Sequence, residues 1–220
     1  MKFSIEDMME NSFVIVKDNF EYGRFCSRMK SAGFSHLPRK YFGLFPRGLM
    51  QCSQERVPMV ACALAHFSIV NMAFAMKLPS VTIFESDAYP MKQCHEHLNA
   101  LFSNNGIPDD AHLITLGNLH FIREYDNGNN NHSLYDVKDG FGRIKRNLWG
   151  AHAVIILRDG YEEWLGKFRK HDEEFHADYF NQLCDKSYST DRSYFIQVKK
   201  SLEYPDWIRD KQYLSDFPEI

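Results

Sequence analysis

Two acidic residues, Glu85 and Asp87, are the strongest candidates for chemistry in this sequence. They flank Ser86 directly after an uncharged, β-branched run at residues 80–84, which predicts a buried strand. Because alternate residues of an extended chain point to the same side, the two carboxylates can converge on one point. Paired carboxylate oxygens suit Mg²⁺ or Mn²⁺ bound also by substrate phosphates. The triplet therefore predicts a divalent cation site, with a solvated turn as the plainer interpretation.

Cysteine and histidine offer further metal-capable side chains. Cys62 and His66 lie one helical turn apart, a spacing more typical of core packing than of a ligand pair. A lone buried histidine such as His66 is most often hydrogen-bonded to backbone. The run Cys-His-Glu-His at residues 94–97 would be divided between helix faces, and no second cluster completes a tetrahedral site. The run therefore does not predict a structural zinc ion.

Composition and missing motifs exclude several classes of function. The 220 residues carry a formal net charge of −3, which argues against nucleic acid as the main partner. There is no Gly-x-Ser-x-Gly, no dinucleotide fingerprint and no phosphate-loop motif. The five cysteines are widely spaced and odd in number, which favours a reducing compartment. The first ten residues do not read as a secretory signal, so the cytoplasm is the expected location.

The elements that must position these residues alternate between strands and helices. This order predicts a single α/β domain over residues 1–220 with a largely parallel sheet, and ligand sites beyond the carboxyl ends of its strands. An Asn- and Gly-rich stretch at 123–142 predicts a flexible loop or lid. We expect strands at 12–16, 41–45, 80–84, 112–116, 153–157 and 194–198, and helices at 20–32, 57–76, 91–104, 160–168 and 175–184.

The helix predicted at 57–76 is long and uncharged enough to span a bilayer. Its polar residues, among them Ser68 and Asn71, and its many alanines favour a helix buried in a protein core. We expect it to pack on the sheet, with the strands at 12–16 and 80–84 as parallel neighbours.

Residues 61–66 (Ala-Cys-Ala-Leu-Ala-His), followed after a helix by residues 83–88 (Ile-Phe-Glu-Ser-Asp-Ala), resemble family 25 of the glycosyltransferases. That family includes lipooligosaccharide and collagen galactosyltransferases, and its second motif ends Glu-Asp-Asp-Ala. Residues 150–160 are similar to the family's segment Gly-x-x-Ala-Tyr-x-Ile-Ser-x-x-Gly. The resemblance runs from about residue 13 to residue 178.

The resemblance implies a GT-A-like, Rossmann-like fold and an inverting hexosyltransferase. The implied donor is a UDP-hexose such as UDP-galactose, and the acceptor is a cell-surface glycan or lipooligosaccharide, as in lipopolysaccharide biosynthesis. It implies Mn²⁺ or Mg²⁺ held by Glu85 and Asp87, with Asp178 as the candidate base and His176 as the second candidate. Substrate or nucleotide contacts would fall at Val16, His66, Glu85, Asp87, Gly150 and His152.

Departures from the family pattern favour an alternative function. Ser86 replaces the middle acid, and Val154 and Leu157 replace the tyrosine and serine of the later block. The alternative is a catalytically inactive, GT-A-like sugar- or nucleotide-binding scaffold. For either function the expected location is cytoplasmic, with peripheral association at the inner face of the membrane as a further option.

Overall fold

The computed structural model describes residues 1–43, 57–117, 134–144, 150–170, 177 and 184–197. Within these ranges, the helices are α1 (Ile5–Glu10), α2 (Asn19–Ser31), α3 (Val57–Ala75), α4 (Cys94–Asn105) and α6 (Arg158–Lys170). The strands of the main sheet are β1 (Ser12–Val16), β2 (Arg39–Phe42), β3 (Ser80–Glu85), β5 (Leu113–Thr115), β6 (Leu134–Lys138), β7 (Phe141–Ile144), β8 (Ala153–Leu157) and β9 (Ser187–Thr190). Two short strands, β4 (Ala88–Pro90) and β10 (Phe195–Gln197), form a second sheet.

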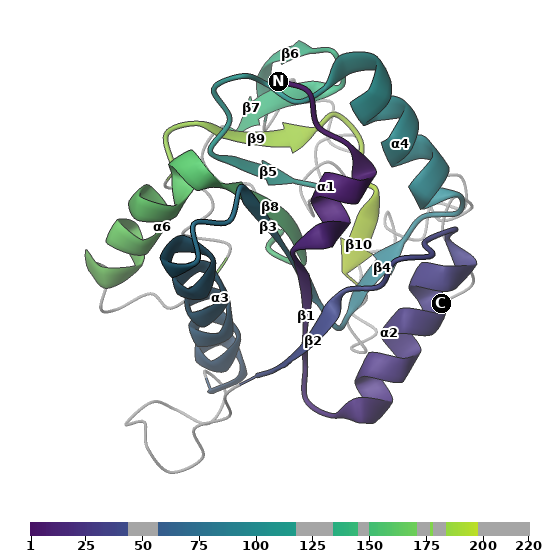
Figure 1. Cartoon of the computed structure of the whole chain (residues 1–220), viewed down its shortest axis with the longest axis vertical. Coiled ribbons are helices and arrows are strands. Elements are labelled where there is room, and N and C mark those ends of the chain that lie inside the picture. The colour runs from purple at the N-terminus through teal and green to yellow at the C-terminus, as the bar shows by residue number, and fades with distance from the viewer. Residues whose placement is uncertain (44–56, 118–133, 145–149, 171–176, 178–183, 198–220) are drawn as a thin grey trace, which may run out of the picture.

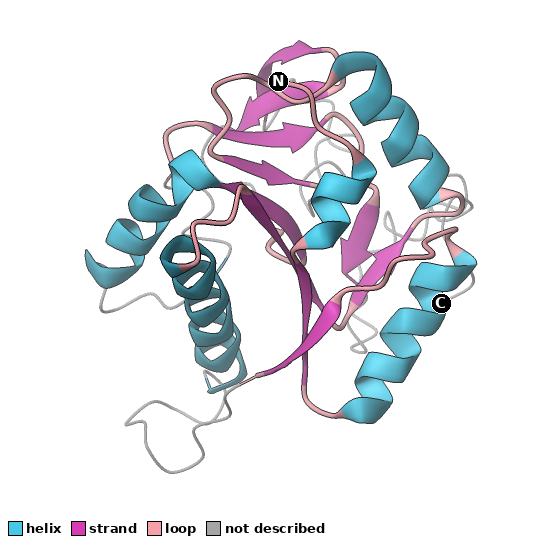
Figure 2. Ribbon diagram, viewed as in Figure 1, coloured by secondary structure: helices cyan, strands magenta, loops and turns pink. Residues whose placement is uncertain are grey.

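The main sheet has eight strands in the order β2-β1-β3-β8-β5-β9-β7-β6 within the described ranges. β1 runs parallel to both β2 and β3, and β5 runs parallel to β9. Of these eight strands, β8 and β7 run against the common direction. Helices lie on both faces of this sheet (Figures 1 and 2). The predicted α/β fold, a mostly parallel sheet flanked by helices, is confirmed.

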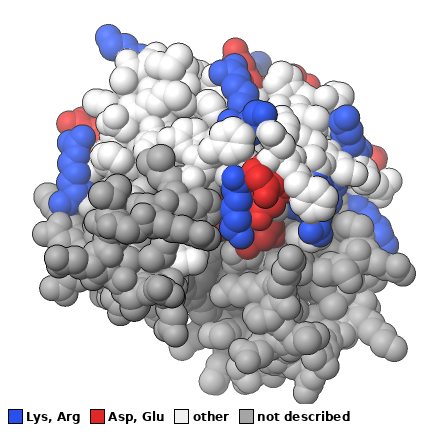
Figure 3. Space-filling model, turned by 90° about the horizontal axis from the view of Figure 1, so that it is seen from below, with Lys and Arg blue, Asp and Glu red and all other residues white. Residues whose placement is uncertain are grey.

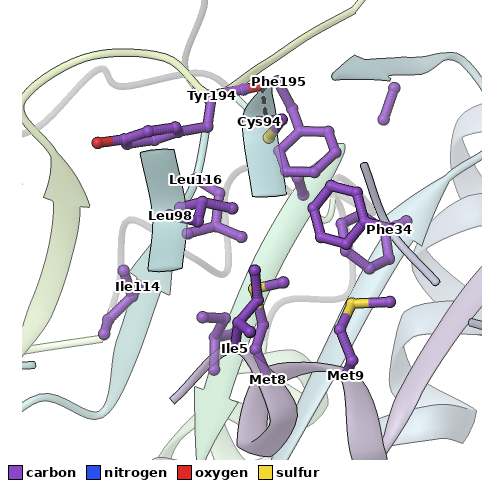
Figure 4. Close-up of a cluster of buried hydrophobic side chains, with 14 of the residues drawn as sticks. Ile5, Met8, Met9, Phe34, Cys94, Leu98, Ile114, Leu116, Tyr194 and Phe195 are labelled. Atoms are coloured by element: carbon purple, nitrogen blue, oxygen red, sulfur yellow. Dashed lines mark hydrogen bonds between the residues drawn. The ribbon is translucent and has the colours of Figure 1, made fainter. Parts of the chain in front are cut away.

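The alternation of side chains along the strands divides the core into two halves. Val14 and Val16 of β1 face a core built with α1, α2 and α4, whereas Phe13 and Ile15 face a core built with α3 and α6. Figure 4 shows part of the first core, where the Cys94 thiol donates a hydrogen bond to the carbonyl oxygen of Tyr194 at 3.5 Å. Burial on both faces explains why these strands read as continuous apolar runs.

Helix α3 packs on the sheet, as predicted. Its residues Ala63, Ile69 and Val70 are fully buried against β1, β3 and α6. β1 and β3 are parallel neighbours, with Val14 paired to Phe84. By length and composition alone α3 also qualifies as a membrane span, and 44% of its window Pro58–Ala75 is buried. Packing on the sheet confirms the prediction of a core helix.

Three predictions of local structure were wrong. The strand expected at 41–45 lies at 39–42. The strand near 194–198 does not join the main sheet but pairs antiparallel with β4. Residues 134–142 are not a loop, because β6 and β7 form a hairpin there. The rest of the expected lid and the body of the helix expected at 175–184 lie outside the described residues.

The β6–β7 hairpin follows from its turn residues. Asp139 and Gly140 both have positive φ, at 53° and 83°, as a two-residue Asp-Gly hairpin turn requires. The side-chain amide of Asn105 donates to the carbonyl oxygen of Asp139 at 2.9 Å. The turn is thereby fixed to the end of α4.

Two glycines of α6 predict opposite effects on stability. A Cβ at Gly160 would lie 2.4 Å from the backbone oxygen of His112, whereas a Cβ at Gly166 would meet nothing within 4 Å. We expect Gly160→Ala to lower the free energy of unfolding by about 1–3 kcal/mol, because the backbone next to β5 must shift. We expect Gly166→Ala to raise it by up to about 1 kcal/mol through helix propensity alone.

Urea denaturation of the two variants beside the wild type measures both changes. Effects of the same sign would contradict the close packing of α6 against the segment that enters β5.

Candidate functional site

The acidic triplet forms the turn between the two sheets. Glu85 is the last residue of β3, and β4 begins at Ala88. The backbone N–H of Glu85 donates to the carbonyl oxygen of His152 at 2.9 Å, which fixes the end of the strand. The carboxyl ends of β1 and β3 point toward the bottom of Figure 1, and Figure 3 shows the molecule from this side, where basic and acidic side chains lie next to one another.

The structure brings Glu85 and Asp87 together through a shared donor. The side-chain nitrogen of Gln197 donates to Asp87 Oδ2 at 2.9 Å and lies 3.4 Å from Glu85 Oε2. Gln197 is opposite Ala88 in the register of β10 and β4, so the small sheet holds the amide over the turn. The two carboxylates therefore converge, as the alternation along the strand predicts.

Asp87 is in an environment that disfavours its charge. Burial raises the pKa of Asp87 to about 6, and the neighbouring charge of Glu85 adds to this effect, against the hydrogen bond from Gln197. The second oxygen, Oδ1, is buried and has no hydrogen-bond partner among the described residues. A mostly buried carboxylate with an unsatisfied oxygen next to a second acid is typical of a site that binds a cation or a proton.

The other oxygen of Glu85 faces helix α3. The Cys62 thiol donates to Glu85 Oε1 at 3.2 Å, and His66 Nε2 lies 3.4 Å from the same oxygen. Burial alone would raise the pKa of Glu85, but attraction to His66 and the bond from Cys62 outweigh burial and hold this pKa below its usual value. Glu85 thus links the turn to α3.

His66 and Cys62 both contact Glu85, a contact that core packing alone does not predict. His66 is 0% exposed, and within the part of the chain that the structure describes neither ring nitrogen makes a hydrogen bond. Of the two roles that the sequence leaves open for His66, a hydrogen bond to backbone is not seen among the described residues, and its Nε2 points to Glu85. Cys62 does pack against the second core, but its sulfur also contacts Glu85.

Arg28 adds a positive charge from α2. Its Nη2 donates to the carbonyl oxygen of Ser86 at 2.5 Å, and its guanidinium carbon lies 4.1 Å from the ring centroid of Tyr89. Burial lowers the pKa of Arg28, while Tyr89 and the carboxylate of Asp87 oppose that effect. A half-buried arginine beside two acids supplies both balancing charge and a donor for an anion.

The remaining predicted contacts have different settings. Val16 is buried in the first core, and its carbonyl oxygen accepts a bond from Gly43 N–H at 3.0 Å. His152 is buried, with Nε2 3.1 Å from the carbonyl oxygen of Phe195 and Nδ1 without a partner in the described ranges. The electrostatic interaction with His152 lowers the pKa of both Glu85 and Asp87.

Less is described for the segment at 150–160 and for the candidate bases. Gly150 has φ of 150°, in the range that favours glycine. Asp178 and His176, the candidate bases, lie outside the described residues.

Sequence reasoning missed two residues of this site. The sequence predicts Gln197 only as part of a last strand, at 194–198, and it gives no role to Arg28. No motif marks Gln197, because only the pairing of β10 with β4 brings it to the turn. Arg28 could have been found from its place one helical turn after Arg24, on the helix that follows β1.

No family model and no curated protein matches this sequence. Among solved structures, the chain is similar to a protein from STIV, with 14% identity, coverage of 84% of this chain and 81% of that one, and a TM-score of 0.41. It is similar to a mannose-1-phosphate geranyltransferase from Thermus thermophilus, with 12% identity and a TM-score of 0.44 over 86% of this chain and 61% of that one. It is also similar to mouse xyloside xylosyltransferase 1, with 8% identity and a TM-score of 0.35 over 83% and 73%. The strand order of the chain is that of a mixed, mostly parallel α/β sheet.

The raised pKa of Asp87 predicts a stability that depends on pH. Its folded-state pKa of about 6 exceeds its usual 3.8, so this residue lowers the free energy of unfolding as the pH rises from about 4 to about 6. Asp87→Asn removes that penalty while its amide oxygen still accepts from Gln197. We expect the metal-free variant to be more stable than the wild type by about 1–3 kcal/mol at pH 7.5, and equal to it below pH about 3.5.

Asp110 provides a control of opposite sign. The hydrogen bond from the Tyr188 hydroxyl and the charge of Arg143 hold the pKa of Asp110 below its usual value. Asp110→Asn should therefore lower the melting temperature at pH 7.5, where Asp87→Asn raises it. Melting curves in chelator from pH 3 to 8 test both variants, and a loss of stability in Asp87→Asn at pH 7.5 would contradict the prediction.

Proposed function

We propose that this chain is a nucleotide-sugar-dependent glycosyltransferase, a divergent member of family 25. The observation that carries the proposal is the pair Glu85 and Asp87, which converge at the carboxyl end of β3, with Asp87 Oδ1 unsatisfied among the described residues. Ligands of open α/β sheets bind at this edge. The finer proposal is a UDP-hexose donor such as UDP-galactose and a cell-surface glycan or lipooligosaccharide acceptor.

The residues present fit a divalent cation. Asp87 and Glu85 offer hard carboxylate oxygens, and the buried Oδ1 of Asp87 is an acceptor that a cation would satisfy. Mn²⁺ or Mg²⁺ would be held by Asp87 with help from Glu85, and when bound it would neutralise negative charge on the diphosphate of the donor.

The chain's own residues perform the other parts of the proposed mechanism. Gln197 keeps the two carboxylates oriented, and Arg28, whose guanidinium lies beside the turn, balances negative charge there. Inversion at the anomeric carbon needs a base that accepts the proton of the acceptor hydroxyl. We assign that role to Asp178, with His176 as the second choice, because the carboxylates of the turn are already committed. Val16, His66, Gly150 and His152 are proposed to contact or support the donor.

A non-catalytic sugar- or nucleotide-binding scaffold is the second candidate. Two observations favour it: Ser86 stands in place of the middle acid, and one oxygen of Glu85 is already occupied by Cys62 and His66. In this function the turn would bind a nucleotide sugar without cleaving it. Turnover of the donor separates the two candidates.

Replacement of Asp87 tests the proposed cation site. We expect Asp87→Asn to lower Mn²⁺ affinity in the presence of UDP by at least about tenfold, because one negative charge facing the cation is lost. Ser86→Ala is the matched control, since Arg28 bonds the backbone oxygen of Ser86 and alanine keeps it. Titration calorimetry with Mn²⁺ and UDP measures both, and equal affinity in wild type and Asp87→Asn would refute the site.

Replacement of Asp178 tests the proposed base. We expect Asp178→Asn to abolish transfer while donor binding and melting temperature stay close to wild type, because asparagine caps a helix about as well as aspartate. Measurement of sugar transfer and UDP release checks this. Transfer near the wild-type rate would show Asp178 to be a cap and would make His176 the next residue to replace.

A further inference from the structure

Three metal-capable side chains from two elements meet beside the acidic turn. Cys62 and His66 lie on one face of α3, and Glu85 ends β3. Their sulfur, nitrogen and oxygen ligand atoms all lie within 4.8 Å of one another. We refer to these residues as the Cys–His–Glu cluster.

The buried ring of His66 favours the binding of an ion by the cluster. Its side chain is fully buried, and both ring nitrogens lack hydrogen-bond partners among the residues that the structure describes. Burial of an unpaired polar group is costly, so such groups usually find a partner. His66 Nε2 lies 3.4 Å from Glu85 Oε1, which is too far for a good hydrogen bond. At this separation both atoms can bind the same ion between them.

The spacing of the cluster fits tetrahedral coordination. Bonds of about 2.0–2.3 Å from zinc to oxygen, nitrogen and sulfur place neighbouring ligand atoms about 3.4–3.6 Å apart. Cys62 Sγ and His66 Nε2 lie 3.2 and 3.4 Å from Glu85 Oε1. The ligand atoms of Cys62 and His66 lie within 4.8 Å of each other, so they need to approach by up to about 1 Å for the three atoms to surround one ion.

The ligand types select the ion. Thiolate and imidazole favour Zn²⁺ and its neighbours among the transition metals, whereas Mg²⁺ and Mn²⁺ favour all-oxygen sites. Three protein ligands leave a fourth position for water or a substrate atom, as in catalytic rather than structural zinc sites.

We propose that Cys62, His66 and Glu85 form a three-ligand site for Zn²⁺, which lies beside the nucleotide-dependent cation site proposed at Asp87 and shares Glu85 with it. Binding releases the Cys62 thiol proton to solvent, so affinity rises with pH. The site requires no nucleotide and does not depend on the proposed transfer reaction.

Reconstitution of the whole chain with Zn²⁺ or Co²⁺ alone tests the site. After chelation, metal addition and dialysis in reducing buffer, we expect close to one zinc ion per chain by elemental analysis, and a rise in melting temperature. Co²⁺ should give the absorption of tetrahedral coordination together with a thiolate-to-metal charge-transfer band. A wild-type chain that retains no zinc would overturn the proposal.

Substitutions assign the ligands. Cys62→Ser should remove the charge-transfer band and lower zinc affinity by at least about tenfold. Cys94→Ser is the matched control, because it removes a buried thiol outside the cluster and serine can still donate to the carbonyl oxygen of Tyr194. A band that survives Cys62→Ser, or that Cys94→Ser removes equally, would overturn the assignment. If Cys62→Ser does not fold, Glu85→Gln replaces it, and unchanged zinc affinity there overturns the proposal.

Asp87→Asn separates this inference from the proposed function. Zinc binding should persist in Asp87→Asn, while UDP-dependent Mn²⁺ affinity should fall by at least about tenfold. Zinc binding without any nucleotide binding in the wild type would support the Cys–His–Glu site and refute the glycosyltransferase proposal. Nucleotide-dependent Mn²⁺ binding without zinc binding would refute the Cys–His–Glu site and support the glycosyltransferase proposal.

Discussion

Two carboxylates held close together in a largely buried turn are the constraint on which the site depends. The negative charges of Glu85 and Asp87, which share one amide donor, repel each other. Burial removes the water that would screen this repulsion. Side chains from three elements contact the turn and offset part of this repulsion. They are Gln197 of β10, Arg28 of α2, and the pair Cys62 and His66 of α3, which faces Glu85. Even so, Asp87 Oδ1 stays unsatisfied among the described residues, and the pKa of Asp87 stays raised. Such residual cost is typical of a functional site rather than of a stabilising one.

The fold makes this turn possible because both faces of the sheet are covered. Strands β1, β3 and β8 are buried along almost their whole length. Charged side chains are therefore first found at the last residue of β3 and in the turn that follows it. The small sheet of β4 and β10 then fixes the chain beyond the turn. The pairing of β10 with β4 places Gln197 between the two acids.

The sequence sufficed for the parts of the fold governed by local periodicity. The runs at 12–16, 80–84 and 153–157 and the long apolar helix were predictable because each run is uniformly buried and the helix packs on the sheet. The β6–β7 hairpin was missed because the neighbouring asparagines outweighed the Asp139-Gly140 turn signal. The partners of the acidic turn could not be predicted, since Gln197 is 110 residues from Asp87 and Cys62 is 23 residues from Glu85. Such contacts are set by tertiary pairing and leave no local pattern.

Glu85 is the residue at which the two proposed sites meet. Its Oε1 faces Cys62 and His66, while its Oε2 faces Gln197 and, through it, Asp87. A carboxylate with separated partners on its two oxygens can bridge two ions, as each oxygen keeps lone pairs for a different ligand. Zinc on the α3 side would withdraw charge from Glu85 and thereby reduce the repulsion felt by Asp87. Because Ser86 between the two acids carries no charge, the turn has only these two carboxylates, and occupancy of the proposed zinc site would decide how much of the charge of Glu85 remains for a cation at Asp87.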